Sequence, residues 1–357
     1  RSSLAHRHLL KGEGHQSPFE YQAGCVRVIV AKEWGASAAG QHLVSCLVNL
    51  LCRQVGIVER VEIDSEIAAL RVWMPAGRQS DFPACMTWLA AWAVGEQVSV
   101  LTKGFVTQPD FLVHVGPPTH DVPKSRFPPL VVMASGWRAW VGSEANMQRD
   151  RDAVPASSNP IGPFFAASLV AGEIFKRHRG LRRGLYLTDN GYSLWSGEAD
   201  SDWNRLQEGP PLNGATVPPF HLIGAGAVGN AVAYVLAAAE LRSAYIATID
   251  DDRYDDTNLN RCLLAGIKDV EDFKVYSLER ALRDVNIDCF ASPRTLSEYL
   301  GSDRTGLRED LARQVDELVF QHVLSCDDKG VSRQHVQGLW PETLMGGSTL
   351  DLIARTN

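Results

Sequence analysis

The feature that most constrains this chain is a glycine-rich turn between an apolar run and a helical run. Its three glycines have the spacing G-x-G-x-x-G: Gly224, Gly226 and Gly229. Such a turn lets backbone N–H groups and a helix N-terminus face a phosphate. The apolar run 220–223 precedes the turn, and the helical run 230–241 follows it. A second apolar run, 244–249, ends on Asp250, and an acid at this point meets a ribose in such folds. Alone, the motif predicts a βαβ nucleotide site, by default that of an NAD-linked oxidoreductase.

The residues that follow Asp250 favour a triphosphate over a dinucleotide. They include a second acid, an amide and two cations: Asp252, Asn258, Arg261 and Lys274. A dinucleotide site needs one acid here and an apolar slot for adenine. Arginine offers fork-shaped donors to phosphate oxygens, lysine offers a point charge, and carboxylates can hold Mg²⁺. The stretch therefore predicts an ATP site with Mg²⁺.

In these residues the sequence resembles the superfamily of ThiF, MoeB and the ubiquitin-activating enzymes. The family pattern is G-x-G-x-x-G, D-x-D, S-N-L-x-R, K, and a later C-x-D-N…R. Here 257–261 reads Thr-Asn-Leu-Asn-Arg, with Thr where Ser is usual, and Cys262 stands where Gln is common. The resemblance is specific over residues 220–350 and far weaker before them.

The later motif begins at Cys326 and contains two adjacent acids. By resemblance we place the Mg²⁺ aspartate at Asp328, because Arg333 then follows five residues later. Asp327 is the alternative, and Lys329 stands where Asn is common.

The resemblance also implies a role for each motif residue. The three glycines admit the phosphates, Asp250 takes the ribose hydroxyls, and Asp252 can assist the metal. The residues expected to act on the reacting phosphates are Asn258, Arg261, Lys274, Asp328 and, as an arginine supplied by the other half of the chain, Arg7.

Simpler interpretations of single residues stay open at this stage. The glycine turn can exist without a ligand, Asn258 and Arg261 can form a capped surface turn, and Lys274 can be a solvated helix lysine. Each is plausible alone, but all of them together at the family spacing are not favoured.

The first half of the chain has the same order of elements as the second. Val26–Val30 predicts a strand, a turn around Trp34 and Gly35 follows, and 38–55 predicts an apolar helix. The run 58–63 then ends on Asp64. Two of the three loop glycines are missing, so we expect a Rossmann-like half without a nucleotide site. Two unrelated βαβ units are the alternative.

These patterns predict an α/β protein of two tandem Rossmann-like, ThiF-type modules with mainly parallel sheets. We expect an inactive adenylation-like half at 1–200, a linker rich in Gly, Pro, Asp and Asn at 201–219, and an active half at 220–357. By resemblance, an inactive half followed by an active half implies a pseudo-dimer of the kind found in ubiquitin-activating enzymes and in their bacterial counterparts from antiphage operons.

The composition of the chain limits which classes of partner and cofactor we expect. The net charge is −7 without a basic block, which disfavours nucleic acid, and no apolar run has membrane length. Seven cysteines without a Cys-x-x-Cys pair do not support a zinc site and fit free thiols in the cytoplasm. Because the first residue is Arg1, we expect a trimmed chain or a fragment.

The resemblance implies adenylation of the C-terminal carboxylate of a ubiquitin-like protein, followed by transfer to a conjugating-enzyme-like acceptor. The usual catalytic cysteine would lie beyond Asn357. The alternatives are adenylation of a sulfur-carrier protein or of a small or RNA-borne carboxylate, and a nucleotide-binding scaffold. Homo-oligomerisation stays open.

Overall fold

The structure is a computed structural model that describes residues 24–66, 68–77, 81–118, 123–143, 155–180, 187–301, 321–327, 330–350 and 353–356. Two predicted site residues, Arg7 and Asp328, lie outside the described residues.

The chain divides into two compact units. The first holds the described residues up to Leu212 together with Leu259–Arg261, and the second holds Asn213–Asn258 and the described residues from Cys262 onward. The expected boundaries at 200 and 220 stay predictions.

The described part of the first unit contains an eight-stranded sheet of order β3-β2-β1-β4-β5-β6-β7-β8. Neighbouring strands are parallel from β3 to β5 and antiparallel from β5 to β8. The strands are β1 (Gly24–Val30), β2 (Val58–Asp64), β3 (Ser99–Leu101), β4 (Phe111–Val115), β5 (Leu130–Ser135), β6 (Arg138–Gly142), β7 (Asn190–Ser193) and β8 (Ala199–Asp200). The helices are α2 (Lys32–Gly35), α3 (Ala38–Cys52), α4 (Phe82–Val94), α5 (Ile161–His178) and the short 3₁₀ helix η2 (Trp203–Arg205).

Burial explains the central strands and helices of this unit. Every residue of β4 and β5 is buried, which is typical of parallel strands covered on both faces. Helix α3 packs against α4, α5 and the sheet, and almost all of its residues are buried. Ser37 starts this helix by accepting a hydrogen bond from the Gly40 N–H at 3.0 Å.

The second unit has a six-stranded sheet, within its described part, of order β11-β10-β9-β12-β13-β14. All neighbours are parallel except β13 and β14. The strands are β9 (Phe220–Ile223), β10 (Tyr245–Ile249), β11 (Asp288–Ser292), β12 (His322–Ser325), β13 (Thr343–Leu350) and β14 (Ile353–Thr356). The helices are α6 (Ala227–Ala238), α7 (Lys274–Arg283), α8 (Leu296–Gly301), α10 (Gly330–Gly338) and the 3₁₀ helices η3 (Asp256–Asn260) and η4 (Ile267–Asp269).

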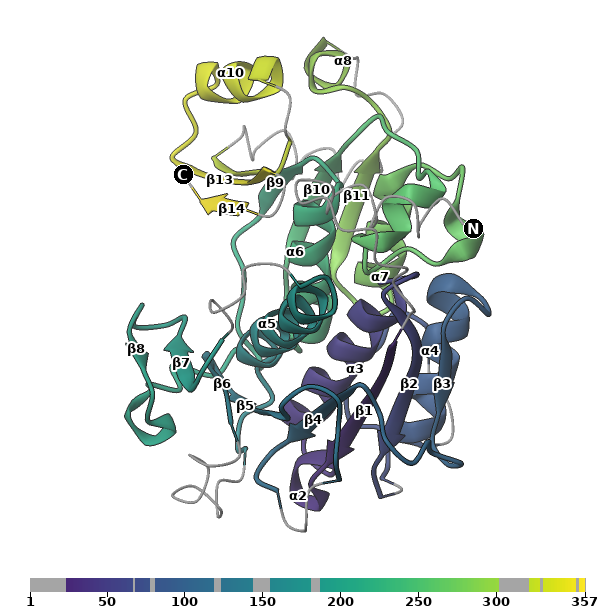
Figure 1. Ribbon diagram of the computed structural model, residues 1–357. Coiled ribbons are helices and arrows are strands. Elements are labelled where there is room, and N and C mark those ends of the chain that lie inside the picture. Colours follow the sequence, from purple (N-terminus) through teal and green to yellow (C-terminus); the bar gives the residue numbers. More distant parts are fainter. Residues whose placement is uncertain are drawn as a thin grey trace. The chain divides into compact units, whose positions relative to one another are not determined.

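Helices cover both faces of the second sheet. Helices α6 and α7 pack together on one face, and α8 and α10 lie on the other (Figure 1). The face beneath α8 and α10 is an apolar cluster made of Ile223, Tyr245, Ile249, Leu296, Tyr299, Val323 and Val336. This sandwich of helix, sheet and helix is the architecture of a doubly wound α/β fold.

The two sheets share one topology. Strands β3-β2-β1-β4-β5-β6 and strands β11-β10-β9-β12-β13-β14 follow the same order, with four parallel pairs and then an antiparallel one. This confirms the predicted α/β class with mainly parallel sheets. In such sheets the ligand crevice lies where the strand order reverses, at the carboxyl ends of β9 and β12. The pseudo-dimer arrangement stays a prediction.

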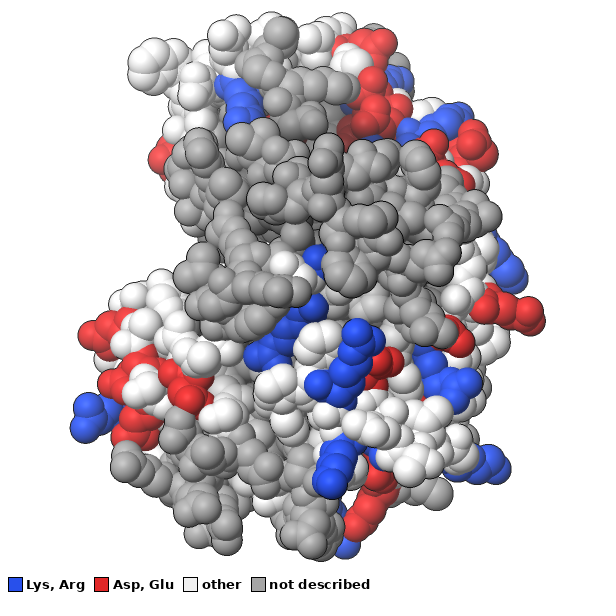
Figure 2. Space-filling model, in the orientation of Figure 1, with Lys and Arg blue, Asp and Glu red and all other residues white. Residues whose placement is uncertain are grey.

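Two further observations concern the hydropathy of the helices and the charge of the surface. Within the described residues no helix has both the length and the apolar character that crossing a bilayer requires. On the face drawn in Figure 2, basic and acidic side chains are intermingled.

Candidate nucleotide site

The glycine loop joins β9 to α6, and two of its glycines are required by close packing. Gly224 has φ +91°, which side chains rarely adopt, and a Cβ there would lie 2.8 Å from the backbone nitrogen of Asp327. A Cβ on Gly229 would collide with the carbonyl oxygen of Gly224. These glycines let the loop after β12 and the first turn of α6 approach the β9 turn closely.

Gly226 differs, because space is open around it. A Cβ built there would meet no heavy atom of the described residues within 4 Å. Gly226 is the N-cap of α6 and has no side chain to cap the helix. Space is therefore open beside the N-cap of α6, and a helix N-terminus is a place where proteins bind phosphate.

Asp250 follows β10 directly and is tied to the glycine loop. One carboxylate oxygen accepts the N–H of Ala225 at 2.6 Å, and the other accepts the N–H of Asp252 at 2.8 Å. Burial raises the pKa of Asp250, and the two backbone N–H donors oppose that rise. The acid is thus positioned beside the loop where the motif predicts the ribose contact.

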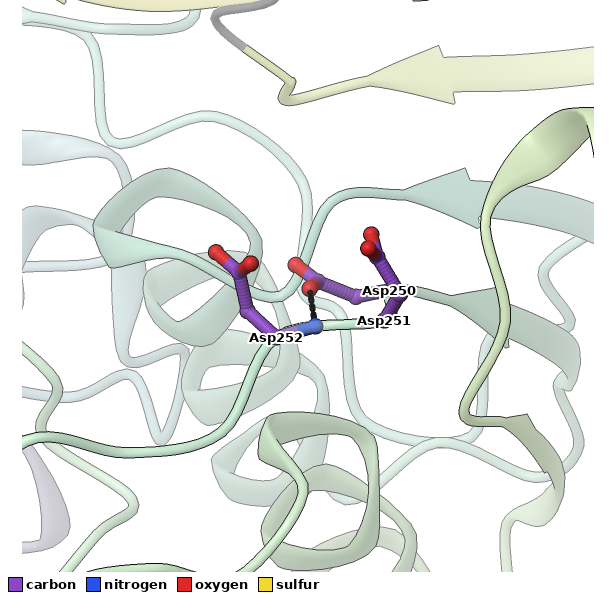
Figure 3. Close-up of side chains that lie close together, drawn as sticks. All are labelled: Asp250, Asp251 and Asp252. Carbon is purple, nitrogen blue, oxygen red and sulfur yellow. Dashed lines mark hydrogen bonds between the residues drawn. The ribbon is translucent and has the colours of Figure 1, made fainter.

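Asp250, Asp251 and Asp252 form an acidic cluster with ligand atoms within 4.8 Å of one another. Figure 3 shows their three carboxyl groups projecting from the same short segment after β10. Oxygen ligands of this kind suit Mg²⁺. Of these three acids, only Asp252 was expected from the sequence to assist the metal.

Lys274 is a buried residue at the start of α7, and not a solvated helix lysine. Its Nζ lies 2.7 Å from Oδ2 of Asp252, and its backbone N–H donates to the carbonyl oxygen of Asp252 at 2.9 Å. A cation in the first helical turn is opposed by the helix dipole, and the Asp252 carboxylate offsets this. Because Lys274 lies at the helix end where the dipole disfavours a cation, its position supports a functional role.

Asn258 and Arg261 belong to different units. Asn258 is the last residue of a segment of the second unit, and Arg261 belongs to the first unit. In the second unit, the amide oxygen of Asn258 accepts the N–H of Asp255 at 3.2 Å, so this side chain does cap a turn. In the first unit, Arg261 donates through Nη1 to Oδ1 of Asn260 at 2.9 Å. Their predicted phosphate contacts stay predictions.

A buried polar network links α6 to the first turn of α7 through Tyr254, and the sequence motifs did not reveal it. Asn230 of α6 donates to the Tyr254 hydroxyl at 3.0 Å and accepts the N–H of Leu264 at 2.7 Å. The Tyr254 hydroxyl lies 2.6 Å from Oγ of Ser277, which donates to the carbonyl oxygen of Lys274 at 2.9 Å. A single Asn inside an apolar helix was the available clue.

Arg53 is a second residue that the motifs did not reveal. It is fully buried in the first unit, and its Nε donates to Oδ1 of Asn49 at 2.7 Å. Its Nη1 donates to the carbonyl oxygen of Leu259 at 2.7 Å, inside the Asn-Leu-Asn-Arg motif. The guanidinium also lies 5.6 Å from the ring centroid of Trp92. Arg53 therefore fixes the backbone that precedes Arg261.

In the first unit the corresponding turn has no comparable space. Trp34 lies in the short helix α2, is only 1% exposed, and is packed so that a Cβ on Gly116 would collide with its indole. Gly116 follows β4, at the point where the strand order reverses. The indole thus fills the region that a phosphate would need.

Comparisons with known proteins agree with the motifs. Residues 220–336 match the ThiF family, and residues 25–186 match the BilD N-terminal domain. No curated protein sequence matches the chain.

Two solved structures show the extent of the similarity. E. coli TcdA, a tRNA N6-threonylcarbamoyladenosine dehydratase in complex with AMP, is 19% identical over 36% of this chain and 49% of that chain, with a TM-score of 0.28. A complex of E. coli MccB with MccA-N7isoASN is 19% identical over 39% of this chain and 38% of that chain, with a TM-score of 0.30. The chain spans less than half of the length of each protein.

The family match and the glycine-loop geometry coincide in one stretch of the second unit. The ThiF family match covers residues 220–336, the stretch that also contains the nucleotide motifs.

Proposed function

We propose that the chain uses ATP and Mg²⁺ to adenylate the C-terminal carboxylate of a ubiquitin-like protein. The observation that carries this proposal is the glycine loop, with open space at Gly226 and with Asp250 hydrogen-bonded to the next residue, Ala225. The ThiF family match supports the same class of chemistry. The separate BilD N-terminal domain match supports a chain of two halves.

Different residues would bind different parts of the nucleotide. The N–H groups at the start of α6 receive phosphate, and Asp250 turns from the Ala225 N–H to the ribose hydroxyls. Lys274 lies next to Asp252 and can exchange that carboxylate for a phosphate oxygen. Arg261 and Asn258 are proposed to bind the triphosphate, and Arg7 to add charge from the first half.

The chemistry requires only positioning and charge. A carboxylate oxygen of the substrate attacks the α-phosphorus of ATP, an O–P bond forms, and the bond to the bridging oxygen breaks. Pyrophosphate leaves with the electron pair, and an acyl-adenylate remains. Donors held in advance at the phosphates stabilise the charge that develops in the transition state.

The described residues fit the metal that this reaction uses. The cluster of Asp250, Asp251 and Asp252 supplies hard oxygen ligands beside the glycine loop. Asp328 stays our proposed principal ligand. Bound Mg²⁺ would neutralise phosphate charge, and Lys274 would hold Asp252 in reach of it.

The first half is proposed to serve without binding nucleotide. Trp34 occupies its turn, while Arg53 supports the backbone before Arg261. We place the protein in the cytoplasm, in a ubiquitin-like conjugation pathway of antiviral defence with a conjugating-enzyme-like acceptor.

The test is ATP–pyrophosphate exchange by the full chain. The reaction is run with the ubiquitin-like protein encoded beside it, and with the same protein after its C-terminal carboxylate is amidated. We expect exchange that needs ATP, Mg²⁺ and the free carboxylate. Exchange that occurs only with a sulfur-carrier protein or a small carboxylate would reassign the substrate. Absence of exchange with every carboxylate would refute adenylation.

A further inference from the structure

A pocket of mixed charge lies in the first unit, at the amino ends of the parallel strands β1, β2 and β4. Cys25 is the second residue of β1, Arg60 is the third residue of β2, and Asp110 directly precedes β4. The pocket is thus at the opposite end of β1 from the turn that Trp34 fills. Its volume is about 320 Å³, and the described residues around it include Cys25, Glu59, Arg60, Val106, Asp110 and Arg126.

A buried ion pair fixes the wall of the pocket that carries Val106. Arg27 and Glu62 lie on β1 and β2, are 7% and 0% exposed, and bond through Nε and Oε2 at 2.8 Å. The other carboxylate oxygen of Glu62 accepts the N–H of Val106 at 2.8 Å, and Nη2 of Arg27 donates to the Val106 carbonyl oxygen. These extra bonds satisfy the buried charges, so the wall is held in place without a ligand.

Asp110 fixes the neighbouring wall. Its Oδ2 accepts the N–H of Cys25 at 2.8 Å, and its own N–H donates to the carbonyl oxygen of Cys25 at 3.0 Å. The N–H of Phe127 donates to the Asp110 carbonyl oxygen at 3.0 Å, and the Phe127 ring stacks on Phe111 with 4.5 Å between centroids. The segment that carries Arg126 is therefore anchored beside β4.

The two arginines at the pocket keep donors for a ligand. Nη1 of Arg60 lies 4.0 Å from Oε1 of Glu62, which is too long for a hydrogen bond. Nη1 of Arg126 lies 3.5 Å from Oδ1 of Asp110, at the outer limit of one. Each guanidinium has five N–H donors in a fork that matches a carboxylate. The pair can therefore bind an anionic group inside the pocket.

The two carboxylates restrict the charge of the ligand. Asp110 and Glu59 balance the two arginines, so the four formal charges around the pocket cancel. Glu59 is exposed, and within the described part of the chain its carboxylate has no ion pair. A polyanion would be repelled by both acids, whereas a molecule with one anionic and one cationic group would be attracted by both signs of charge.

The size of the pocket restricts the ligand further. Sites for small molecules have volumes of roughly 300–1,000 Å³, and this pocket is at the lower end of that range. Val106 and Cys25 supply the uncharged part of the lining. The ligand is therefore a small zwitterion with a short side chain.

We propose that this pocket binds a free α-amino acid. Its carboxylate is held by Arg60 and Arg126, and its ammonium group is held by Glu59. The binding requires no nucleotide and no carboxylate activation, so the inference does not rest on the proposed function. The first unit, in which Trp34 fills the nucleotide turn, thus has a ligand site of its own.

The test screens the full chain for binding without ATP. The unfolding temperature is measured with each of the common amino acids in turn, and calorimetry gives the Kd of the one that raises it most. We expect its N-acetyl derivative and its C-terminal amide, which each lack one charge, to bind at least about tenfold more weakly. The proposal is overturned if no amino acid binds, or if inorganic phosphate binds as tightly as the best one.

Three variants assign the contacts. Arg60→Met, Arg126→Met and Glu59→Gln should each weaken binding of that amino acid by about tenfold or more, because each removes one charge-assisted bond. Arg205→Met and Glu66→Gln are the matched controls, since they remove an arginine and an acid that are 73% and 64% exposed in the same unit. Both controls should leave the affinity unchanged. An unchanged unfolding temperature without ligand shows that each variant is folded.

The outcomes separate this inference from the proposed function. Wild-type affinity in Arg60→Met and Arg126→Met would place the amino acid elsewhere and overturn the pocket assignment. Wild-type affinity in Glu59→Gln, together with tight binding of the N-acetyl derivative, would show a carboxylate site and overturn the zwitterion. ATP–pyrophosphate exchange is not among the measurements. If exchange is absent and the amino acid binds, only the adenylation proposal fails, and the converse result removes only this inference.

Discussion

The three glycines of the glycine loop are present for different physical reasons, although the sequence motif does not distinguish them. Gly224 needs its positive φ and its close approach to the loop after β12, and Gly229 needs its contact with Gly224. Gly226 needs neither. Its φ of −68° and ψ of −158° are open to other residues. The loop therefore contains two structural glycines and one that leaves room for a ligand.

Gly226→Ala should separate binding from folding. The free energy of unfolding should change by less than about 1 kcal/mol, since Ala replaces Gly only at a helix N-cap. ATP affinity should fall by about tenfold or more, because the new methyl group stands where phosphate approaches. Gly224→Ala is the contrasting variant and should lose about 2 kcal/mol or more of stability. Urea unfolding and ATP titration measure both effects, and equal stability losses would contradict the distinction.

Lys274→Met should reduce ATP–pyrophosphate exchange by roughly a hundredfold or more, as expected when one donor to the developing charge is lost, on the order of 3 kcal/mol. The fold should survive, because the Asp252 side chain left without its partner is 51% exposed. Arg261→Ala should have a similar effect on exchange. Exchange kinetics test both, with Arg283→Met, which removes an exposed helix arginine, as the control. Normal rates would remove these residues from the site.

At the scale of elements, helix α3 shows how the end of a buried helix differs from the end that its apolar run predicts. Its apolar run predicts residues 38–55, and the helix ends earlier, at Cys52. Arg53 and Gln54 donate their N–H groups to Leu50 and Leu51, and Val55 pairs with Val58 before Gly56 turns at φ +87°. The helix thus ends three residues before its predicted end at Val55.

The same helix carries a buried histidine that should make the first unit sensitive to acid. Burial lowers the pKa of His42 to about 3, from an ordinary value of 6.5. The unfolded chain therefore binds this proton first. The stability that the neutral ring contributes is present above pH 6.5 and is lost as the pH falls toward 3. The slope approaches about 1.4 kcal/mol per pH unit.

His42→Gln should remove about one proton from the pH dependence of unfolding between pH 6 and pH 4. Urea titrations at several pH values give the slope for both proteins. His114, whose pKa burial lowers to about 4, leaves a residual slope in the variant. Identical slopes with and without His42 would show that this ring is not the group that titrates.

At the scale of the whole molecule, the two sheets share one topology, but their first turns differ in the space beside them. We expect one ATP per chain by calorimetry, because Trp34 fills the first turn and Gly226 leaves the second turn open. Gly226→Ala should weaken that single site, and Trp34→Phe should leave it unchanged. Two sites per chain would contradict the degenerate-copy interpretation.

The burial of the cysteines lets us predict whether the adenylated carboxylate is transferred to a thiol of this chain. Six of the seven are buried, and burial raises the pKa of Cys25, Cys52, Cys289 and Cys326 to about 12. Thiols at such pKa values are poor nucleophiles at neutral pH. With ATP and the ubiquitin-like protein, residues 1–357 should form adenylate but no thiol-labile adduct on gel electrophoresis. An adduct that a reducing agent removes would identify a reactive cysteine here.

The sequence by itself determined the α/β class, the repeat of strand, helix and strand, and the family motif from Gly224 to Lys274. These follow from local periodicity and from residue types at fixed spacing, which one stretch of chain contains. The tertiary structure alone decided which loop glycine is open, the burial of Lys274 beside Asp252, and the contact between Arg53 and Leu259. It also placed Arg60 and Arg126 at one pocket. Such juxtapositions join residues from separate elements, and no local pattern encodes the distance between them.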